Sequence, residues 1–242
     1  MNTPARPRVK RVLLKLSGEA FQPRNGGQGI DPDVLASLAA QLQELRDRGA
    51  EIAIVVGGGN IFRGLKGVDS GVDRTAGDHM GMLATVINSL ALQAALEKRD
   101  IPTRTMTAIS MPAVAEPFIR RRAMRHLEKG RVVIFGAGTG NPYFTTDSAA
   151  ALRATEIRAD LLMKGTKVDG IYDKDPMENS DAVRYESVTY DEALKKQLRV
   201  MDAAAFSLCM DNEIPIVVFN FFKKNEMVRV FESEPVGTLV HQ

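Results

Sequence analysis

Short apolar runs alternate with longer segments of helical period through most of this chain, and that alternation restricts its fold more than any other feature. The expected strands are residues 12–16, 51–56, 103–108 and 131–135, and the expected helices are residues 32–48, 75–99, 117–128 and 147–157. Crossovers from one strand through a helix to the next are right-handed, so they give a mainly parallel sheet with helices on both faces. The sequence therefore predicts an α/β protein, a three-layer sandwich with a mainly parallel central sheet.

The C-terminal third continues the pattern around one polar loop. Buried strands are expected at residues 160–166 and 215–219, and the acidic segment VDGIYDKDP between them has the composition of turns. No low-complexity linker or internal repeat divides the sequence. We therefore expect residues 1–242 to form one domain, with a soft division into lobes 1–146 and 147–242.

Glycine-rich turns follow three of the expected strands. They are KLSGEAF at residues 15–21, GGGN at residues 57–60 and GTGNPYFTTD at residues 138–147. Glycine lets backbone N–H groups approach an anion, and threonine hydroxyls add donors at the start of a helix. Open α/β sheets bind ligands at the carboxyl ends of their strands, so the three turns should form one phosphate-binding site. The alternative for the last turn alone is an ordinary strand-to-helix connection in which Thr146 or Asp147 caps the helix.

The overall composition argues against a nucleic-acid-binding or membrane protein. The 242 residues carry a formal net charge of +2, and 44% of them are hydrophobic, so one large core is expected. Residues 1–11 lack the apolar centre of a secretory signal, and we expect a cytoplasmic protein. The apolar stretch 82–96 contains Asn88 and Ser89 and is expected to be a buried or interface helix. Cys209, the only cysteine, is expected in the core.

Five blocks of the sequence carry a family resemblance. The chain has neither the GxxxxGK[ST] loop of P-loop kinases nor the glycine loop and HRD motif of protein kinases. It has instead, in this order, KLSGEAF, GGGNIFRG, GDHMGMLAT, GTGNPYFTTDSAA and TKVDGIYDKDP. These blocks resemble the amino acid kinase superfamily, and within it GDHMGM and GTGNPYFTTD are similar to the bacterial UMP kinases. The resemblance covers nearly the whole chain.

The resemblance implies an activity and an assembly. The activity would be transfer of the γ-phosphoryl group of ATP to UMP, with Mg²⁺ bound to the nucleotide and no dedicated metal site on the protein. Lobe 1–146 would bind the nucleoside monophosphate and lobe 147–242 would bind ATP. The assembly would be a homohexamer, a trimer of dimers, with UTP and GTP as effectors. Activation by GTP stays open, because the segment 23–29 carries Gln28 and one residue more than the family pattern.

Phosphoryl transfer needs cations and backbone donors more than a strong base. Lys15, beside Ser17 and Gly18, is the first choice for a cation that bridges the two phosphates. Arg63 offers a forked donor to a neighbouring oxygen, with a surface arginine as the alternative. Asp147 would orient the lysines. Lys164 is expected either to be a second charge-stabilising cation or to extend to solvent at a strand end.

The resemblance also implies two sets of nucleotide contacts. The ATP contacts would come from Lys15, Leu16, Ser17, Gly18, Gly59, Arg63, Thr166, Tyr172 and Asp175. The UMP contacts would come from Gly58, Asp78, Thr139, Gly140, Asn141, Pro142, Tyr143, Phe144, Thr145 and Thr146. The residues alone leave simpler roles open, since Asp78 also suits a helix cap and Tyr172 also suits packing. The three histidines do not cluster, and no metal site is expected.

Two rival functions and one unassigned segment remain. The first rival is a carboxylate or carbamate kinase of the same superfamily, and the GTGNPYFTTD block argues against it. The second is a non-catalytic anion-binding or storage protein on the same fold, which the joint presence of Lys15, Arg63, Asp78 and Asp147 argues against. The basic segment 119–131 fits a solvated helix face better than an effector surface or a nucleic-acid patch.

Overall fold

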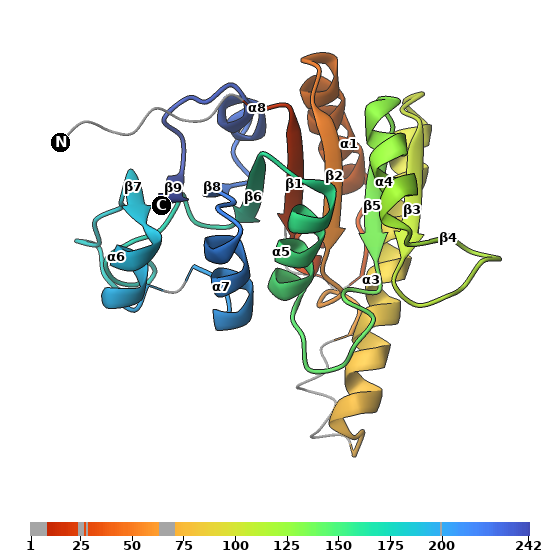
Figure 1. The fold of residues 1–242 in the computed structure, drawn as a ribbon, viewed down its shortest axis with the longest axis horizontal. Helices are drawn as coiled ribbons and strands as arrows, with labels where there is room; N and C mark the ends of the chain where they lie inside the picture. Colours follow the sequence, from red (N-terminus) through yellow and green to blue (C-terminus); the bar gives the residue numbers. More distant parts are fainter. Residues whose placement is uncertain (1–8, 24–26, 28, 63–70, 199) are drawn as a thin grey trace.

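The computed structural model describes residues 9–23, 27, 29–62, 71–198 and 200–242. Within these residues one sheet of nine strands runs through the whole molecule, in the order β4-β3-β5-β2-β1-β6-β8-β9-β7 (Figure 1). The strands are β1 (Arg11–Leu16), β2 (Glu51–Val56), β3 (Thr103–Thr107), β4 (Glu116–Pro117), β5 (Val132–Gly136), β6 (Leu161–Thr166), β7 (Ser187–Thr189), β8 (Ile216–Asn220) and β9 (Thr238–His241). Neighbouring strands are parallel except β8 and β9, which are antiparallel.

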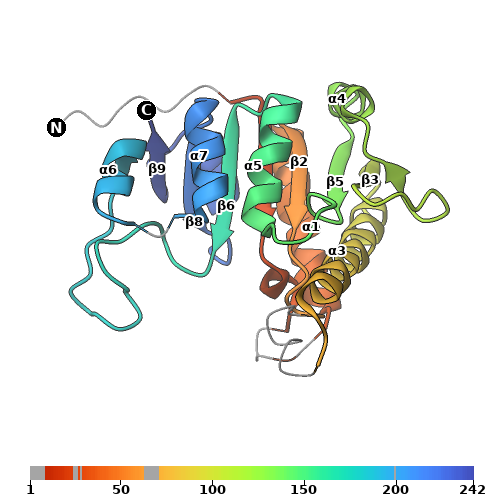
Figure 2. The ribbon, with the colours of Figure 1, turned by 60° about the horizontal axis from the view of Figure 1, so that its bottom comes forward.

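Helices cover both faces of the sheet, as Figures 1 and 2 show. They are the 3₁₀ helix η1 (Gly18–Phe21) and the α-helices α1 (Pro32–Asp47), α3 (Arg74–Glu97), α4 (Arg120–Glu128), α5 (Thr146–Ile157), α6 (Tyr190–Lys195), α7 (Ala203–Asp211) and α8 (Glu226–Phe231). One core lies beneath α1, α3 and α8, and a second lies beneath α4, α5, α6 and α7. The predicted three-layer α/β sandwich is confirmed.

Alternation along β1 assigns its side chains to the two cores. Leu14 and Leu16 lie in the core beneath α1, whereas Leu13 lies in the core beneath α5. Successive side chains of a strand point to opposite faces, so Lys15 shares the face of Leu13. A strand that is buried on both faces thus brings one lysine to the α5 side.

Local signals in the sequence explain where α1 begins and which face it buries. The side chain of Asp31 accepts hydrogen bonds from the N–H groups of Asp33 and Val34, and Pro32 occupies the first turn. The buried leucines are Leu35, Leu38, Leu42 and Leu45, spaced three or four residues apart. Each fully buried leucine contributes about 1.5–3 kcal/mol relative to an exposed one.

The predicted elements of the first two thirds are confirmed with small shifts, and one helix needs correction. The helix expected at 117–128 begins at Arg120, because Glu116 and Pro117 form the short strand β4, which pairs with Met106 and Thr107 of β3. In the last third the sequence analysis did not predict β7, β9, α6, α7 or α8. Cys209, in α7, is buried as expected, and burial raises the pKa of its thiol to about 12.

Helix α3 is long enough and apolar enough to cross a membrane by length and composition alone. It packs against the sheet instead, and its buried residues include Thr85, Asn88 and Ser89. The expected burial of this helix is confirmed for the face that contacts the sheet.

Candidate active site

Two lysines meet on neighbouring strands at the carboxyl edge of the sheet. The parallel register of β1 and β6 places Lys15 directly beside Lys164. Residues that are paired in this way present their side chains on the same face of the sheet. Both lysines therefore lie on the α5 side.

Asp147 bridges the two lysines. Its Oδ1 lies 2.8 Å from Nζ of Lys15, and its Oδ2 accepts a hydrogen bond of 2.7 Å from Nζ of Lys164. Lys164 also donates to the carbonyl oxygen of Val200 at 2.6 Å. The side chains of Lys15, Asp147 and Lys164 are only 11%, 15% and 14% exposed. We call these three residues the Lys–Asp–Lys cluster, and it carries two positive charges and one negative charge.

The pKa shifts in the cluster follow from burial and from its charges. Burial raises the pKa of Asp147, but the charges and hydrogen bonds of Lys15 and Lys164 outweigh burial and hold it below the ordinary value. Burial lowers the pKa of Lys164, and the charge of Asp147 offsets only part of that effect. Asp147 is therefore held as a carboxylate between the two lysines, and its lowered pKa makes it a weak base.

The first turn of α5 fixes the position of Asp147. The hydroxyl of Thr145 caps the helix by accepting from the N–H groups of Asp147 and Ser148. Thr145 in turn donates to the carboxylate of Asp202, which also accepts from the hydroxyl of Ser148 at 3.1 Å. The sequence analysis missed Asp202, although an aspartate directly before AAAFSLCM is the signal of a helix cap, and Asp202 does cap α7.

The glycine-rich turns after β1 and β2 pack backbone against backbone. A Cβ atom on Gly18 would lie 2.5 Å from the backbone nitrogen of Gly59. A Cβ atom on Gly58 would lie 2.7 Å from the carbonyl oxygen of Gly81 in α3. Only glycine fits at these two positions, so both turns approach the site as bare backbone.

A cavity of about 520 Å³ opens on the α3 side of the cluster. Its walls come from the GGGN turn, the first half of α3 and the loop 138–147, and they include Gly58, Asp78, Thr139, Asn141, Phe144, Thr145 and Thr146. Asp78 Oδ2 accepts from the backbone N–H of Tyr143 at 2.8 Å and from Nε of Arg74 at 2.9 Å. Asp78 thereby ties the loop to the helix.

A second cavity of about 610 Å³ lies on the C-terminal side of the cluster. Lys164 lines it at one end, and Thr166, Tyr172 and Asp175 line it further along. The Lys–Asp–Lys cluster therefore lies between two cavities, one lined mostly by each half of the chain.

Comparisons with known proteins give the family. Residues 10–220 match the sequence profile described as "Amino acid kinase family". This chain belongs to the amino acid kinase family.

Solved structures extend the comparison. The chain is similar to a UMP kinase from Bacillus anthracis, with 40% identity, 97% of each chain covered and a TM-score of 0.94. It is similar to a UMP kinase from Ureaplasma parvum, with 39% identity, 98% of this chain and 100% of that chain covered and a TM-score of 0.91. A uridylate kinase from Archaeoglobus fulgidus has 25% identity, with 95% of this chain and 99% of that chain covered and a TM-score of 0.71.

The structure brings together most of the residues that the sequence analysis selected. Lys15, Asp147 and Lys164 are in direct contact. Of the other selected residues, Thr166, Tyr172 and Asp175 line one cavity, and Gly58, Asp78, Thr139, Asn141, Phe144, Thr145 and Thr146 line the other. Gly59, which was expected to contact ATP, also lines the second of these cavities, and Ser17, Gly18, Gly140, Pro142 and Tyr143 line neither. Leu16 differs, because its side chain is buried in the core beneath α1, on the opposite face of the sheet from Lys15 and Lys164. Arg63 lies outside the described residues.

The described residues include no group of three or more His, Cys, Asp or Glu side chains placed to hold a metal ion. The carboxylate of Asp147 is engaged by two lysines, and that of Asp202 is engaged by Thr145, Ser148 and the N–H of Ala205. Such a site fits a Mg²⁺ ion that is held by nucleotide phosphates and water better than one held by a protein cage.

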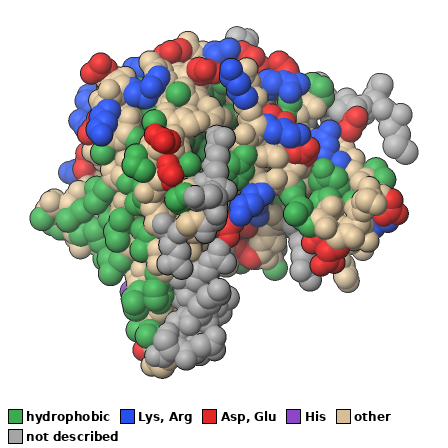
Figure 3. All heavy atoms as spheres, turned by 180° about the vertical axis from the view of Figure 1, so that it is seen from behind, with side chains coloured by type: hydrophobic (Ala, Val, Ile, Leu, Met, Phe, Trp, Pro, Cys, Tyr) green, Lys and Arg blue, Asp and Glu red, His purple; other side chains and the backbone are tan. Residues whose placement is uncertain are grey.

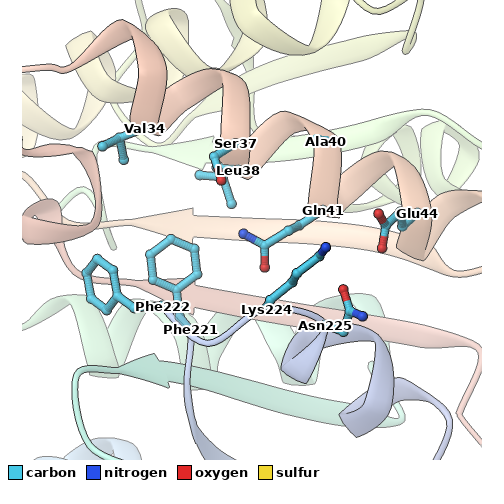
Figure 4. Close-up of a pocket in the computed structure, with 10 residues that line it drawn as sticks. All are labelled: Val34, Ser37, Leu38, Ala40, Gln41, Glu44, Phe221, Phe222, Lys224 and Asn225. Carbon is cyan, nitrogen blue, oxygen red and sulfur yellow. The ribbon is translucent and has the colours of Figure 1, made fainter. Parts of the chain in front are cut away.

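A third cavity, of about 360 Å³, lies away from the cluster, between α1 and the start of α8 (Figure 4). Phe221 and Phe222 form one end of it, and Lys224 extends toward Gln41. None of its lining residues belongs to the two nucleotide-sized cavities.

Proposed function

We propose that this chain is a UMP kinase, which transfers the γ-phosphoryl group of ATP to UMP and forms UDP and ADP in pyrimidine nucleotide biosynthesis. The observation that carries the proposal is the Lys–Asp–Lys cluster between two cavities, each large enough for one nucleotide. The likeness to two UMP kinases at 39–40% identity over nearly the full chain supports the choice of acceptor.

UMP would occupy the cavity beside α3. Its phosphate would lie against the bare backbone of Gly58, and Oδ1 of Asp78, the oxygen not used by Tyr143 and Arg74, would accept from the ribose. The base would meet residues 139–146. ATP would occupy the other cavity, with its phosphates near residues 15–18, Gly59 and Arg63 and its adenosine near Thr166, Tyr172 and Asp175.

A phosphate oxygen of UMP would attack the γ-phosphorus of ATP in line, and the bond from that phosphorus to the β-γ bridging oxygen would break, so that ADP leaves. Lys15 and Lys164 would balance the charge on the moving group. Asp147 would hold the two ammonium groups at a fixed separation. No side chain has to remove a proton, because the attacking phosphate is already an anion at neutral pH.

Mg²⁺ would be held together with ATP rather than by a dedicated site of the protein. When bound, the ion would supply further positive charge on the transferring group. The residues of this chain would orient the nucleotide around it, through the backbone donors of residues 15–18 and the ammonium of Lys15.

We also propose the assembly, effectors and location that the family pattern suggests. The chain would form a homohexamer, a trimer of dimers, in the cytoplasm, under allosteric control by UTP and GTP. The exposed apolar side chains of α3 support an interface between copies, since Met80, Leu83 and Ile87 are 43%, 49% and 50% exposed. In Figure 3, which is turned by 180° from Figure 1, hydrophobic side chains gather at the lower left of the molecule, the side on which α3 lies.

One assay tests the proposal directly. ADP release would be followed with ATP and Mg²⁺ in the presence of UMP, CMP, dTMP, AMP, aspartate, carbamate or no acceptor. We expect turnover with UMP at least a hundredfold above that with the other acceptors. Turnover with aspartate or carbamate alone would identify a carboxylate or carbamate kinase, and ATP binding without any turnover would indicate a storage protein.

A further inference from the structure

One face of α3 holds both of the loops that form the monophosphate cavity. We propose that Thr85 and Asn88 are positioning residues that fix the spacing between the GGGN turn and the loop 138–147. The inference rests on the proposed function, because it assigns a role in acceptor binding and transfer to Thr85, which lines the monophosphate cavity, and to Asn88, which does not.

Asn88 anchors the GGGN turn. It is fully buried, and its Nδ2 donates to the carbonyl oxygen of Gly57 and to Oδ1 of Asn60, both at 2.7 Å. Asn60 returns a hydrogen bond of 3.1 Å to Oδ1 of Asn88 and donates to the carbonyl oxygen of Gly29 at 2.9 Å. Both ends of the turn are thus joined to one side chain of the helix.

Thr85 anchors the start of the other loop. Its hydroxyl accepts a hydrogen bond of 2.8 Å from the backbone N–H of Ala137, the residue before Gly138. The same hydroxyl donates to the carbonyl oxygen of Met82 at 2.6 Å, which fixes its orientation. Thr85 is 6% exposed, so water cannot easily replace it at the Ala137 N–H.

Because both loops are bound to one helix, the geometry of that helix fixes the distance between them. Residues 81, 85 and 88 lie on the same side of a helix, within about two turns. Gly58 rests directly on this side, because a Cβ atom there would lie 2.7–3.0 Å from atoms of Gly81, Ala84 and Thr85. The two loops can move apart only if one of them leaves the helix.

Apolar side chains would fill the same space, so packing alone does not require an amide and a hydroxyl here. The polar atoms of Thr85 and Asn88 are directed at the backbone of the two loops and at Asn60. Such contacts set the position and direction of a loop, which apolar packing does less specifically.

The test compares Thr85→Val and Asn88→Leu, which keep side-chain volume and lose the polar contacts, with Leu92→Val. Leu92 is fully buried one turn further along α3 and lies in the main core away from both loops. Thermal unfolding would be measured for all three variants. Steady-state kinetics would then give kcat and KM for both nucleotides at a temperature below the unfolding transition.

We expect Thr85→Val to raise KM for UMP at least tenfold and KM for ATP less than threefold. We expect Asn88→Leu to lower kcat at least tenfold, Leu92→Val to leave kcat and both KM values within twofold, and Thr85→Ser to restore KM for UMP.

Backbone hydrogen exchange provides a readout that does not depend on the reaction. Thr85→Val should speed exchange at Ala137, and Asn88→Leu should speed it across residues 57–60, each at least tenfold relative to Leu92→Val. Kinetics and exchange that match those of Leu92→Val would overturn the positioning role. Absence of UMP-dependent ADP release from the unchanged chain would overturn the proposed function instead, and the exchange data would still decide whether the two residues hold the loops.

Discussion

At the scale of single residues, the Lys–Asp–Lys cluster is a set of charges placed before any nucleotide arrives. Two ammonium groups are buried around one carboxylate, so the cluster keeps a surplus positive charge where a phosphoryl group would pass. Because the side chains are already held by one another, little reorganisation is needed when an anion binds. The cluster should therefore matter more for turnover than for folding.

Lys15→Met tests this at the first cation. Removal of the ammonium should lower kcat at least a hundredfold, because the charge on the transferring group loses its nearest counter-charge from β1. Steady-state kinetics would measure the effect, with Lys10→Met as the matched control, since Lys10 is exposed, precedes the other end of β1 and pairs with Glu51 rather than with Asp147. Equal activity of the two variants would contradict the role of Lys15.

Asp147→Asn tests the carboxylate through pH. The pKa of Lys164 is already lowered by burial, and the charge of Asp147 raises it. Loss of that charge should lower the pKa of Lys164 further, so the fall of kcat at alkaline pH should begin at lower pH in the variant. A pH–rate profile from pH 6 to 10 measures the shift, and an unchanged alkaline limb would argue against Lys164 as a working cation.

At the scale of elements, the start of α5 connects the cap of one helix with that of another. Thr145 caps α5 and donates to Asp202, the cap of α7. Thr145→Ala should lower the free energy of unfolding by about 1–2 kcal/mol through loss of the cap. It should also raise KM for UMP, since Thr145 lines the cavity. Urea unfolding measures the first effect and steady-state kinetics the second. Thr145→Ser keeps the hydroxyl and should therefore stay close to the unchanged chain in both stability and KM for UMP. If Thr145→Ala matched the unchanged chain in both, Thr145 would not connect the two helix caps with the cavity.

The sequence predicted the elements whose signals are local and repeated, and it missed those whose signals depend on packing. Strands such as β2 are continuous apolar runs, and α1 carries a cap and a leucine stripe, so both were found within one residue of their bounds. Helices α6 and α8 have six residues each, too few for a period to emerge.

The site residues were predicted less completely than the elements. The sequence left open whether Lys164 is a second cation of the site or extends to solvent, because a strand pattern does not reveal the register of the strand. Only the pairing of β6 with β1 places Lys164 beside Lys15. Asp202 was missed as a site residue because Thr145 and Ser148, which it contacts at the start of α5, are more than fifty residues away in the chain.

At the scale of the whole molecule, α3 has two faces with different tasks. One face holds the loops, and the other exposes Met80, Leu83 and Ile87. Ile87→Glu should place a charge in the proposed interface and convert the hexamer into smaller species. Light scattering after size-exclusion chromatography would measure the mass, with Val183→Glu as the control, since Val183 is an exposed apolar residue between β6 and β7. A hexamer that survives Ile87→Glu would place the interface elsewhere.

The helix that holds both loops also limits how the length of this chain can change. Each added residue turns the rest of a helix by about 100°. A single insertion or deletion between Gly81 and Asn88 would therefore swing one anchor away while the other stayed in place. Related chains should gain and lose residues in the acidic loop around residues 173–182, where the backbone follows no regular element, and keep the count constant across this stretch of α3.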